Sequence, residues 1–238
     1  MKLITPLLAL LCLAPAAHAA SAWEGLVTLK ITGPGIPGQF VNYSVRNGII
    51  RVDLLGGDYG SRLVDPAKKE IINIAPGGKT YTRQPFGPAP VMKPGWQVEK
   101  IALTDPINGH PTSHYTVKAD GTRAEVWLAD DMPAELWRLT DGAPWAMALA
   151  GKDGLLLRAI IRDAVSGKII MQMDPDTVES MRQMAADFAP PPDAKEVAAP
   201  TPVAPPPAAA APASKAADDA PPAPAAPRPP APSNGRRR

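Results

Sequence analysis

The segment at residues 43–54, "YSVRNGIIRVDL", most constrains the fold, because it has Asn-Gly at its centre and alternating side chains on both sides. Asn47 and Gly48 readily adopt the positive φ that a type I′ turn requires, so the segment predicts a two-residue hairpin. Such a turn also fixes the register of the two strands. The predicted pairs are Arg46 with Ile49, Val45 with Ile50, Ser44 with Arg51, and Tyr43 with Val52.

The period of two in a strand gives this hairpin two different faces. The apolar face carries Val41, Tyr43, Val45, Ile50, Val52 and Leu54. The polar face carries Asn42, Ser44, Arg46, Arg51 and Asp53. An exposed apolar sheet face would aggregate, so other parts of the chain must cover it.

Further alternating segments, bounded by Gly, Pro and Asp turns, predict a long antiparallel meander. They lie at residues 23–32, 61–65, 70–75, 80–84, 96–104, 113–119 and 122–130, with two more strands inside 154–174 around Ser166-Gly167. Residues 133–139 and 143–151 lose this period and predict short helices, the second with Asp141 as N-cap and Pro144 in its first turn. Residues 174–188 predict a third helix, with Asp174 as N-cap and Pro175 at its first position.

These elements, about ten strands and two or three short helices, favour an α+β fold. The sheet must close into a barrel, stack on another sheet or be covered by helices. The helical segments are too few to fill a large concavity. We therefore expect an antiparallel incomplete (half) β-barrel that is lidded by short helices.

The first 19 residues have one Lys, a short apolar run, and Ala17 and Ala19 placed as a cleavage site. This pattern predicts a secretory signal peptide that is cleaved after Ala19, because the apolar run is far shorter than the ~20 residues of a membrane span. Cys12, the one cysteine of the chain, follows two leucines rather than the small residue of a lipoprotein signal. We expect a periplasmic or secreted protein without a lipid anchor or a disulfide bond.

The C-terminal region becomes mostly Pro and Ala from Ala189 onward. Residues 198–238 cannot bury enough apolar surface to offset their ordering entropy, so they are predicted to form a disordered tail. Its end, Arg236 to Arg238, could meet an anionic polymer of the cell envelope or could simply be a solvated tip. The folded domain is then expected at residues 20–197.

The body of the chain offers little sign of catalysis or of nucleic-acid binding. Residues 23–188 contain 18 Lys and Arg against 19 Asp and Glu, a net charge of −1, so they lack the basic footprint of a nucleic-acid binder. His110 and His114 are separated by Pro111, which disfavours the helical turn that a shared metal would need. Asp130 and Asp131 are interpreted as caps before a helix. We expect no metal, no cofactor and no enzymatic activity.

Four segments together resemble an uncharacterised secreted bacterial family, domain of unknown function 4412. They are "YSVRNGIIRVDLLGGDYGSRLVDPAKKEIINIAPGGKTY", "DPINGHPTSHYTV", "AEVWLADD" and "FAPPPDAKEV", in the order in which that family has its strand, turn and closing motifs. The resemblance spans residues 23–197. That family is similar in architecture to the periplasmic lipoprotein carriers LolA and LolB.

The resemblance implies an incomplete barrel with an apolar cavity for acyl chains or other hydrophobic ligands. In the carriers an Arg just before the corresponding turn helps to gate the lid, and Arg46 is the matching position. The hairpin register places Arg46 on the polar face, which disagrees with a buried gating role. The carriers also lack a Pro-Ala tail.

Aromatic and Met side chains complete the predicted cavity lining, since Met adapts its shape to varied apolar partners. The expected lining residues are Tyr43, Val45, Ile50, Val52, Trp137, Trp145, Met171, Met181 and Met184. The same Met and Trp residues also fit ordinary core packing. We expect a monomer that holds a lipid or a lipidated protein. The alternative is an envelope scaffold or interaction protein that uses its Pro/Ala-rich tail as a spacer.

Overall fold

The Asn-Gly hairpin forms in the predicted register, with Arg46 opposite Ile49 and Tyr43 opposite Val52. Asn47 and Gly48 have φ values of 50° and 78°, as a type I′ turn requires. The computed structural model describes residues 23–55, 60–102, 105–140 and 142–199. The chain divides into two compact units, Met1–Ala199 and Pro200–Arg238. The predicted signal peptide and all but two residues of the predicted tail lie outside the described residues.

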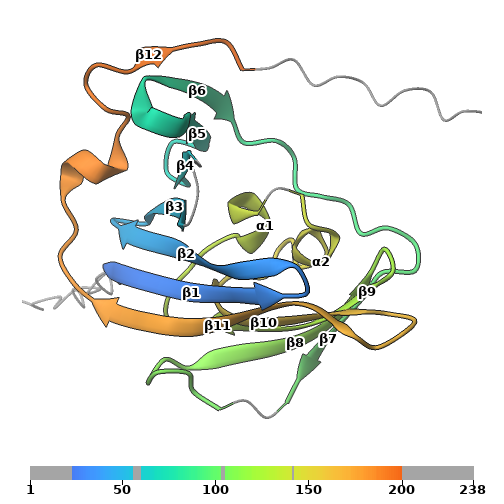
Figure 1. Cartoon of the computed structure of the whole chain (residues 1–238). Helices are drawn as coiled ribbons and strands as arrows, with labels where there is room; N and C mark the ends of the chain where they lie inside the picture. Colours follow the sequence, from blue (N-terminus) through green and yellow to red (C-terminus); the bar gives the residue numbers. More distant parts are fainter. Residues whose placement is uncertain (1–22, 56–59, 103–104, 141, 200–238) are drawn as a thin grey trace, which may run out of the picture. The chain divides into compact units, whose positions relative to one another are not determined.

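The described residues form twelve strands, two α-helices and two 3-10 helices (Figure 1). The strands are β1 (Gly25–Gly33), β2 (Ile36–Arg46), β3 (Ile49–Leu55), β4 (Ser61–Asp65), β5 (Glu70–Ile74), β6 (Thr80–Pro85), β7 (Gln97–Ile101), β8 (Thr112–Ala119), β9 (Thr122–Ala129), β10 (Leu155–Asp163), β11 (Ile169–Ser180) and β12 (Lys195–Glu196). The helices are α1 (Leu136–Leu139), α2 (Pro144–Met147), η1 (Pro76–Gly78) and η2 (Ala185–Phe188).

All twelve strands belong to one sheet, in the order β12-β6-β5-β4-β3-β2-β1-β11-β10-β9-β8-β7. Neighbouring strands are antiparallel except β12, which runs parallel to β6. β1 and β11 are far apart in the sequence, and their pairing joins the N-terminal meander to the C-terminal one. Within the described part of the chain, β12 and β7 form the two edges, so the sheet is open.

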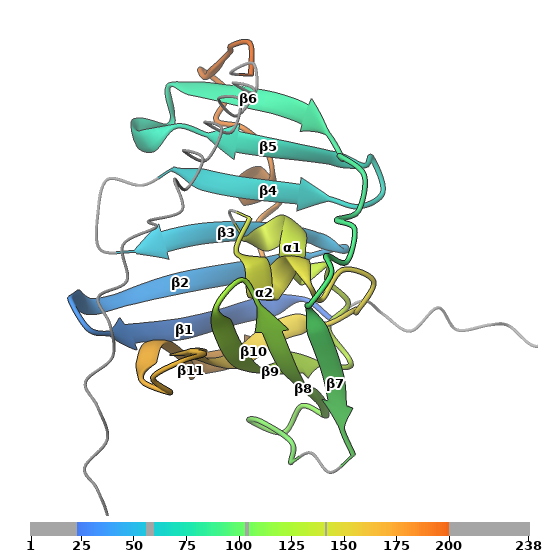
Figure 2. The ribbon, with the colours of Figure 1, turned by 90° about the vertical axis from the view of Figure 1, so that its right-hand side faces the viewer.

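The two short helices pack on one face of the sheet, which we call the inner face (Figure 2). α1 contacts β4, while α2 contacts β8 and β9, so the sheet curves around them. The buried side chains of Leu136, Leu139 and Trp145 join one apolar cluster with Val27, Val45 and other inner-face residues of the strands. The apolar face of the hairpin is therefore covered by the helical segment, whose buried side chains belong to the same apolar cluster.

The predicted helix at residues 174–188 is wrong, because β11 continues through this region to Ser180. Pairing with β1 satisfies the hydrogen-bonding groups of the β11 backbone. A shift of register between Thr28 and Leu29 leaves room for one extra residue in β11. Pro175 lies opposite Leu29, next to that shift, and bulges are among the few places in a sheet where Pro is tolerated. The long-range pairing thus overrides a local helical pattern.

The segment that follows β11, residues 181–197, crosses the opposite face of the sheet, the outer face, and ends at the β6 edge (Figure 1). Arg46 Nη1 donates a hydrogen bond to the Gln183 oxygen, and Arg51 Nη1 donates one to the Asp187 oxygen. We call residues 181–197 the C-terminal strap. It ends in β12, a strand that the sequence pattern did not predict.

Candidate functional site

A row of directly paired residues crosses the inner face and changes from apolar to polar along the sheet. Its members, from β1 to β5, are Val27, Tyr43, Val52, Arg62 and Asn73. Directly paired residues of neighbouring strands project to the same face, so this row follows from the register alone. The inner face therefore has an apolar half on β1–β3 and a polar patch on β4 and β5.

An apolar cavity of about 360 Å³ lies over the apolar half of this face. Its lining residues come from β1, β2, β3, β11 and the segment of α1 and α2. They are Ile31, Ile36, Gln39, Val41, Tyr43, Val52, Leu54, Leu139, Thr140, Ala143, Trp145, Met171 and Met173. No charged side chain occurs among these described lining residues. The volume lies within the range of about 300–1,000 Å³ that is usual for small-molecule sites.

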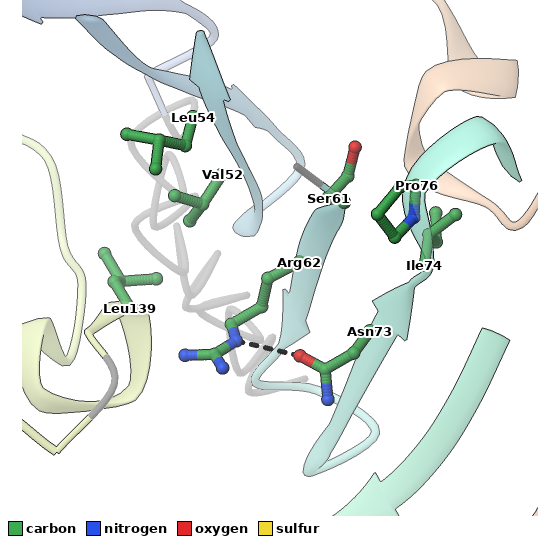
Figure 3. Close-up of a pocket in the computed structure, with 9 residues that line it drawn as sticks. Val52, Leu54, Ser61, Arg62, Asn73, Ile74, Pro76 and Leu139 are labelled. Carbon is green, nitrogen blue, oxygen red and sulfur yellow. Dashed lines mark hydrogen bonds between the residues drawn. The ribbon is translucent and has the colours of Figure 1, made fainter. Parts of the chain in front are cut away.

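A second hollow, of about 300 Å³, adjoins this cavity over β3, β4 and β5 (Figure 3). The two spaces share the side chains of Val52, Leu54 and Leu139. The far side of the second hollow is formed by Ser61, Arg62 and Asn73, together with Ile74 and Pro76. We call it the polar hollow. A ligand could therefore extend from the apolar space toward Arg62 and Asn73. The register of Ser61 and Ile74 places these two residues on the outer face, so the polar hollow reaches past the inner face.

The Arg62 side chain is held in place by hydrogen bonds from both ends of its guanidinium group. Nε donates to Asn73 Oδ1 over 2.9 Å, as Figure 3 shows, and Nη1 donates to the main-chain oxygen of Thr140 over 3.2 Å. These bonds tie β4 to β5 and to the residue after α1. The positive charge is thus positioned at the rim of the polar hollow by its surroundings.

Tyr43 is the polar group most deeply placed beneath the apolar cavity. Its side chain is buried, and this burial raises the pKa of its hydroxyl above the ordinary value. Desolvation penalises the phenolate, so Tyr43 stays neutral at any physiological pH. The cavity floor therefore remains uncharged.

A third hollow, of about 360 Å³, lies on the other side of α1 and includes Trp137, Arg138 and Met147 in its lining. The guanidinium of Arg138 stacks 3.9 Å from the centroid of the Trp137 ring and 3.7 Å from that of Phe86. Trp137 Nε1 is buried without a hydrogen-bond partner among the described residues. Trp137, predicted to line the same space as Trp145, instead lines this third hollow, which shares Arg62 with the polar hollow and Thr140 with the apolar cavity.

The structure brings together four of the predicted lining residues. Tyr43, Val52, Trp145 and Met171 all line the apolar cavity. Val45 and Ile50 are buried in the adjoining core and do not reach the cavity wall. The hairpin pattern predicted correctly that both residues lie on the inner face, but the cavity covers only part of that face.

Met181 and Met184 do not lie where the sequence pattern predicted. Their side chains are 45% and 70% exposed, because both belong to the C-terminal strap and not to a helix that covers the inner face. Arg46 also lies on the outer face, bonded to that strap at Gln183. The gating role that the resemblance implied for Arg46 therefore does not fit its position.

The predicted capping role of Asp130 and Asp131 is wrong as well. Asp130 accepts a hydrogen bond from the Ser113 hydroxyl over 2.6 Å, and Asp131 lies 2.8 Å from His110 Nδ1. The N-cap of α1 is Glu135, which makes no side-chain capping bond. The N-cap of α2 is Ala143, whereas Asp141, the predicted cap, lies outside the described residues.

The described residues show neither a cluster of metal-binding side chains nor a helix that could span a membrane. No group of three or more His, Cys, Asp or Glu side chains is arranged to hold a metal ion within residues 23–55, 60–102, 105–140 and 142–199. In those same ranges no helix has the length and apolar character needed to cross a membrane.

Two solved structures resemble this chain at low sequence identity. No family model and no curated protein matches this sequence. The structure of PNGF-II is similar at 10% identity with a TM-score of 0.47, over 75% of this chain and 32% of that one. This chain thus spans about a third of the length of PNGF-II. Likenesses at such values establish neither a family nor an activity.

A second solved structure is a LolA superfamily protein, NE2245 from Nitrosomonas europaea. It is 11% identical with a TM-score of 0.30, over 71% of this chain and 90% of that chain.

Sequence reasoning missed Arg62, Asn73 and Met173 as residues of the site. Both Leu63 and Val64 of β4 are buried, one on each face, because the helices cover the inner face and a second apolar cluster lies on the outer face. Such a strand gives no alternation from which its inner face could be chosen. Arg62 is assigned to the inner face because it lies opposite Val52, and this register follows from the pairing of β3 with β4.

Proposed function

We propose that this protein is a non-enzymatic, monomeric binding protein of the periplasm that holds a hydrophobic ligand, a lipid or a lipidated protein. The observation that carries the proposal is the apolar cavity of about 360 Å³ between the sheet and the segment of α1 and α2. In this proposal the curved sheet is the wall of an incomplete barrel, and α1 and α2 form its lid.

The side chains that line the cavity support a hydrophobic ligand. Leu, Ile, Val, Met and Trp side chains surround the space, and the neutral Tyr43 is its deepest polar residue. Empty apolar space costs stability because its walls lose packing contacts, so a cavity of this size gains free energy when an apolar chain fills it. Met171 and Met173 are flexible and adapt to ligands of different shape.

A fluorescent probe tests the cavity directly. The neutral dye N-phenyl-1-naphthylamine should bind the purified protein with a rise in fluorescence. Ala143→Phe places a ring in the cavity and should weaken binding of the dye, because Ala143 lines it. Val165→Phe is the matched control, because Val165 is 95% exposed and lies outside the cavity.

Native mass spectrometry of protein purified from its host envelope identifies the natural ligand. A co-purifying lipid supports the proposal. A consistently empty protein that also fails to bind the dye contradicts it and favours the envelope scaffold, in which the Pro/Ala-rich tail acts as the spacer.

A further inference from the structure

We propose that one end of the sheet docks on a lipid bilayer with anionic head groups, and that the ligand passes between this bilayer and the apolar cavity. We call it the hairpin end. It consists of the turns at residues 33–36, 119–122 and 163–169, together with residues 91–96. The passage of ligand rests on the proposed function, whereas docking can be measured by itself.

The turn between β8 and β9 contacts two of the other segments. Its Gly121 oxygen accepts a 2.9 Å hydrogen bond from the Ala164 N–H, in the turn between β10 and β11. Its Asp120 carboxylate accepts hydrogen bonds from Lys93 Nζ over 3.0 Å and from Trp96 Nε1 over 2.8 Å. Residues 91–96 and the β10–β11 turn are therefore both fastened to the β8–β9 turn.

The turn between β1 and β2 completes the hairpin end and brings the apolar cavity to it. Figure 1 shows this turn and the β10–β11 turn at the right-hand ends of their strands. A Cβ atom at Gly33 would lie 2.6 Å from the main-chain oxygen of Ile170, so the two segments are in contact. Ile36, the first residue of β2, and Met171 of β11 line the apolar cavity. The cavity therefore begins beside the hairpin end.

Large apolar side chains are exposed on the hairpin end. Val91 and Met92 are 84% and 50% exposed, and the exposed Val165 lies in the turn between β10 and β11. Ile169 and Ile170, where β11 begins, are also exposed. Apolar side chains that are exposed singly are ordinary, but a group of them marks a surface for a partner or a membrane. The hairpin end therefore has the apolar character of a docking surface.

A row of cations lies beside these tips on the outer face. Lys118, Arg123 and Arg162 are directly paired on β8, β9 and β10, so three positive side chains are neighbours, and Ile169 pairs next in the row. Lys118 and Arg123 are exposed and have no ion-pair partner among the described residues. Arg162 has only a distant one, the Glu125 carboxylate at 4.0 Å.

The charge of this row is not neutralised by the hairpin end itself. Like charges directly opposite each other destabilise a sheet, so anions bound beside them would offset that repulsion. The two carboxylates within the hairpin end, Asp120 and Asp163, are bonded to Lys93 and to Ser166. Lys168 adds a further exposed positive charge. The surface is therefore complementary to anionic groups.

The combination of apolar tips and cations favours an anionic bilayer over a soluble partner. At a membrane surface, apolar side chains enter the boundary between head groups and acyl chains, while Lys and Arg contact the anionic heads. A soluble acidic polymer would neutralise the cations but leave Val165, Ile169 and Ile170 in water. The docking partner is therefore a bilayer that contains lipids with an anionic phosphate head group.

Co-sedimentation with vesicles tests docking in the wild-type protein. Vesicles of phosphatidylcholine alone are compared with vesicles of equal parts phosphatidylcholine and phosphatidylglycerol. The protein should sediment with the anionic vesicles, and added salt should release part of it because salt screens exposed charges. Equal binding to both kinds of vesicle, or binding to neither, overturns the inference. This comparison needs no variant.

Charge variants locate the surface. Lys118→Gln combined with Arg123→Gln should weaken binding to the anionic vesicles by about fivefold for each charge removed. Lys69→Gln combined with Lys152→Gln is the matched control, because both lysines are exposed and come just before β5 and β10, away from the hairpin end. An equal loss in both double variants would mean nonspecific attraction and would overturn the assignment.

The C-terminal arginines need a control of their own, because they could also bind an anionic membrane. Arg236→Ser, Arg237→Ser and Arg238→Ser together should leave most of the binding to anionic vesicles in place. Binding that is lost in this triple variant, but kept when Lys118 and Arg123 are replaced, assigns the contact to the tail and contradicts docking through the hairpin end.

A fluorescent label tests whether the tips enter the membrane. Val165→Cys, in a chain with Cys12→Ser, can carry a single nitrobenzoxadiazole label, whose emission rises in apolar surroundings. Its emission should rise when anionic vesicles are added, and the same label on Lys69→Cys should not respond. A label at Val165→Cys that stays unchanged while the protein sediments with the vesicles overturns the role of the apolar tips.

The outcomes separate docking from the proposed function. If N-phenyl-1-naphthylamine binds the protein but the vesicles do not, docking is overturned and the apolar cavity remains a binding site. If the vesicles bind as expected but the dye does not, the hairpin end remains a membrane surface, and the proposed function falls together with the passage of ligand.

Discussion

Arg46 Nη1 donates a hydrogen bond of 3.0 Å to the main-chain oxygen of Gln183, so the strand before the Asn-Gly turn holds the chain just after β11. Glu24 adds to this contact, because its carboxylate accepts a 2.6 Å hydrogen bond from the Gln183 N–H. The C-terminal strap is thus fastened to the outer face of the N-terminal meander. We therefore expect the strap to contribute to the stability of the domain, and the tail at residues 198–238 to contribute little.

Truncation should distinguish the C-terminal strap from the tail. A chain that ends after Ser180 loses the bonds from Arg46 and Arg51 and the pairing of β12 with β6. The truncation also removes the bond between Glu24 and Gln183. At about 1 kcal/mol for each of the three side-chain bonds, the melting temperature should fall by about 6–12 °C. A chain that ends after Ala199 keeps these contacts and should melt like the full-length protein in a thermal scan. An equal loss in both truncations would contradict the predicted disorder of the tail.

Gly25→Ala should weaken the junction between the two meanders. Gly25 lies opposite both Val45 and Ser180, and an added Cβ would overlap the main-chain oxygen of Glu179 and the ring of Trp23. We expect a loss of about 1–3 kcal/mol in the free energy of unfolding, measured with urea. Gly38→Ala in β2 is the control, since its nearest neighbouring atom would be 3.8 Å away. If Gly25→Ala left the free energy of unfolding unchanged, β1 and β11 could separate at little cost.

Val45→Asp should unfold the domain. Val45 is 6% exposed and belongs to the apolar cluster under the helices, so a carboxylate there is buried without a partner. The expected cost is more than about 3 kcal/mol. Val52→Asp should cost less, because Val52 is half-buried beside the cavity and the polar hollow. Val165→Asp, at a fully exposed turn, is the control, and circular dichroism reports the folded fraction.

His114 should make the protein less stable in mild acid. Burial lowers the pKa of the His114 imidazole, although the nearby Glu125 carboxylate, 3.9 Å away, acts in the opposite direction. The ring also stacks on Trp127 with centroids 4.1 Å apart. The unfolded chain, with a His pKa of about 6.5, therefore binds a proton more readily than the folded protein.

The stability that His114 contributes is thus complete above the unfolded pKa and is lost as the pH falls from there toward the lower folded value. His114→Gln should flatten the pH dependence of the free energy of unfolding below about pH 6.5. Glu125→Gln removes the opposing charge and should make the dependence steeper. Urea titrations between neutral and mildly acidic pH check both, and an unchanged slope in His114→Gln would contradict the assignment.

The N-terminal segment should be removed during export. Its pattern places the cut after Ala19, so Edman sequencing of protein recovered from the periplasm should begin at Ala20. Retention of Met1, or acylation of Cys12, would be incompatible with a soluble periplasmic protein.

Local sequence patterns were enough to predict the elements of the first meander. Asn47 and Gly48 fix a two-residue turn, and the period of two then fixes which side chains of residues 41–54 face the core. These predictions succeed because a tight turn and its flanking strands depend on neighbouring residues alone. The short helices at α1 and α2 were predictable for the same reason.

The remaining features of the fold and of the site depend on contacts between distant parts of the chain. Residues 174–180 carry a helical pattern, yet they form a strand because β1 offers them a partner that lies far away in the sequence. Arg62 reaches the polar hollow because β4 pairs with β3 in a register that places it opposite Val52. The site depends on which strands meet and on what covers each face, and pairing between distant segments is a property of the whole folded chain that no local pattern encodes.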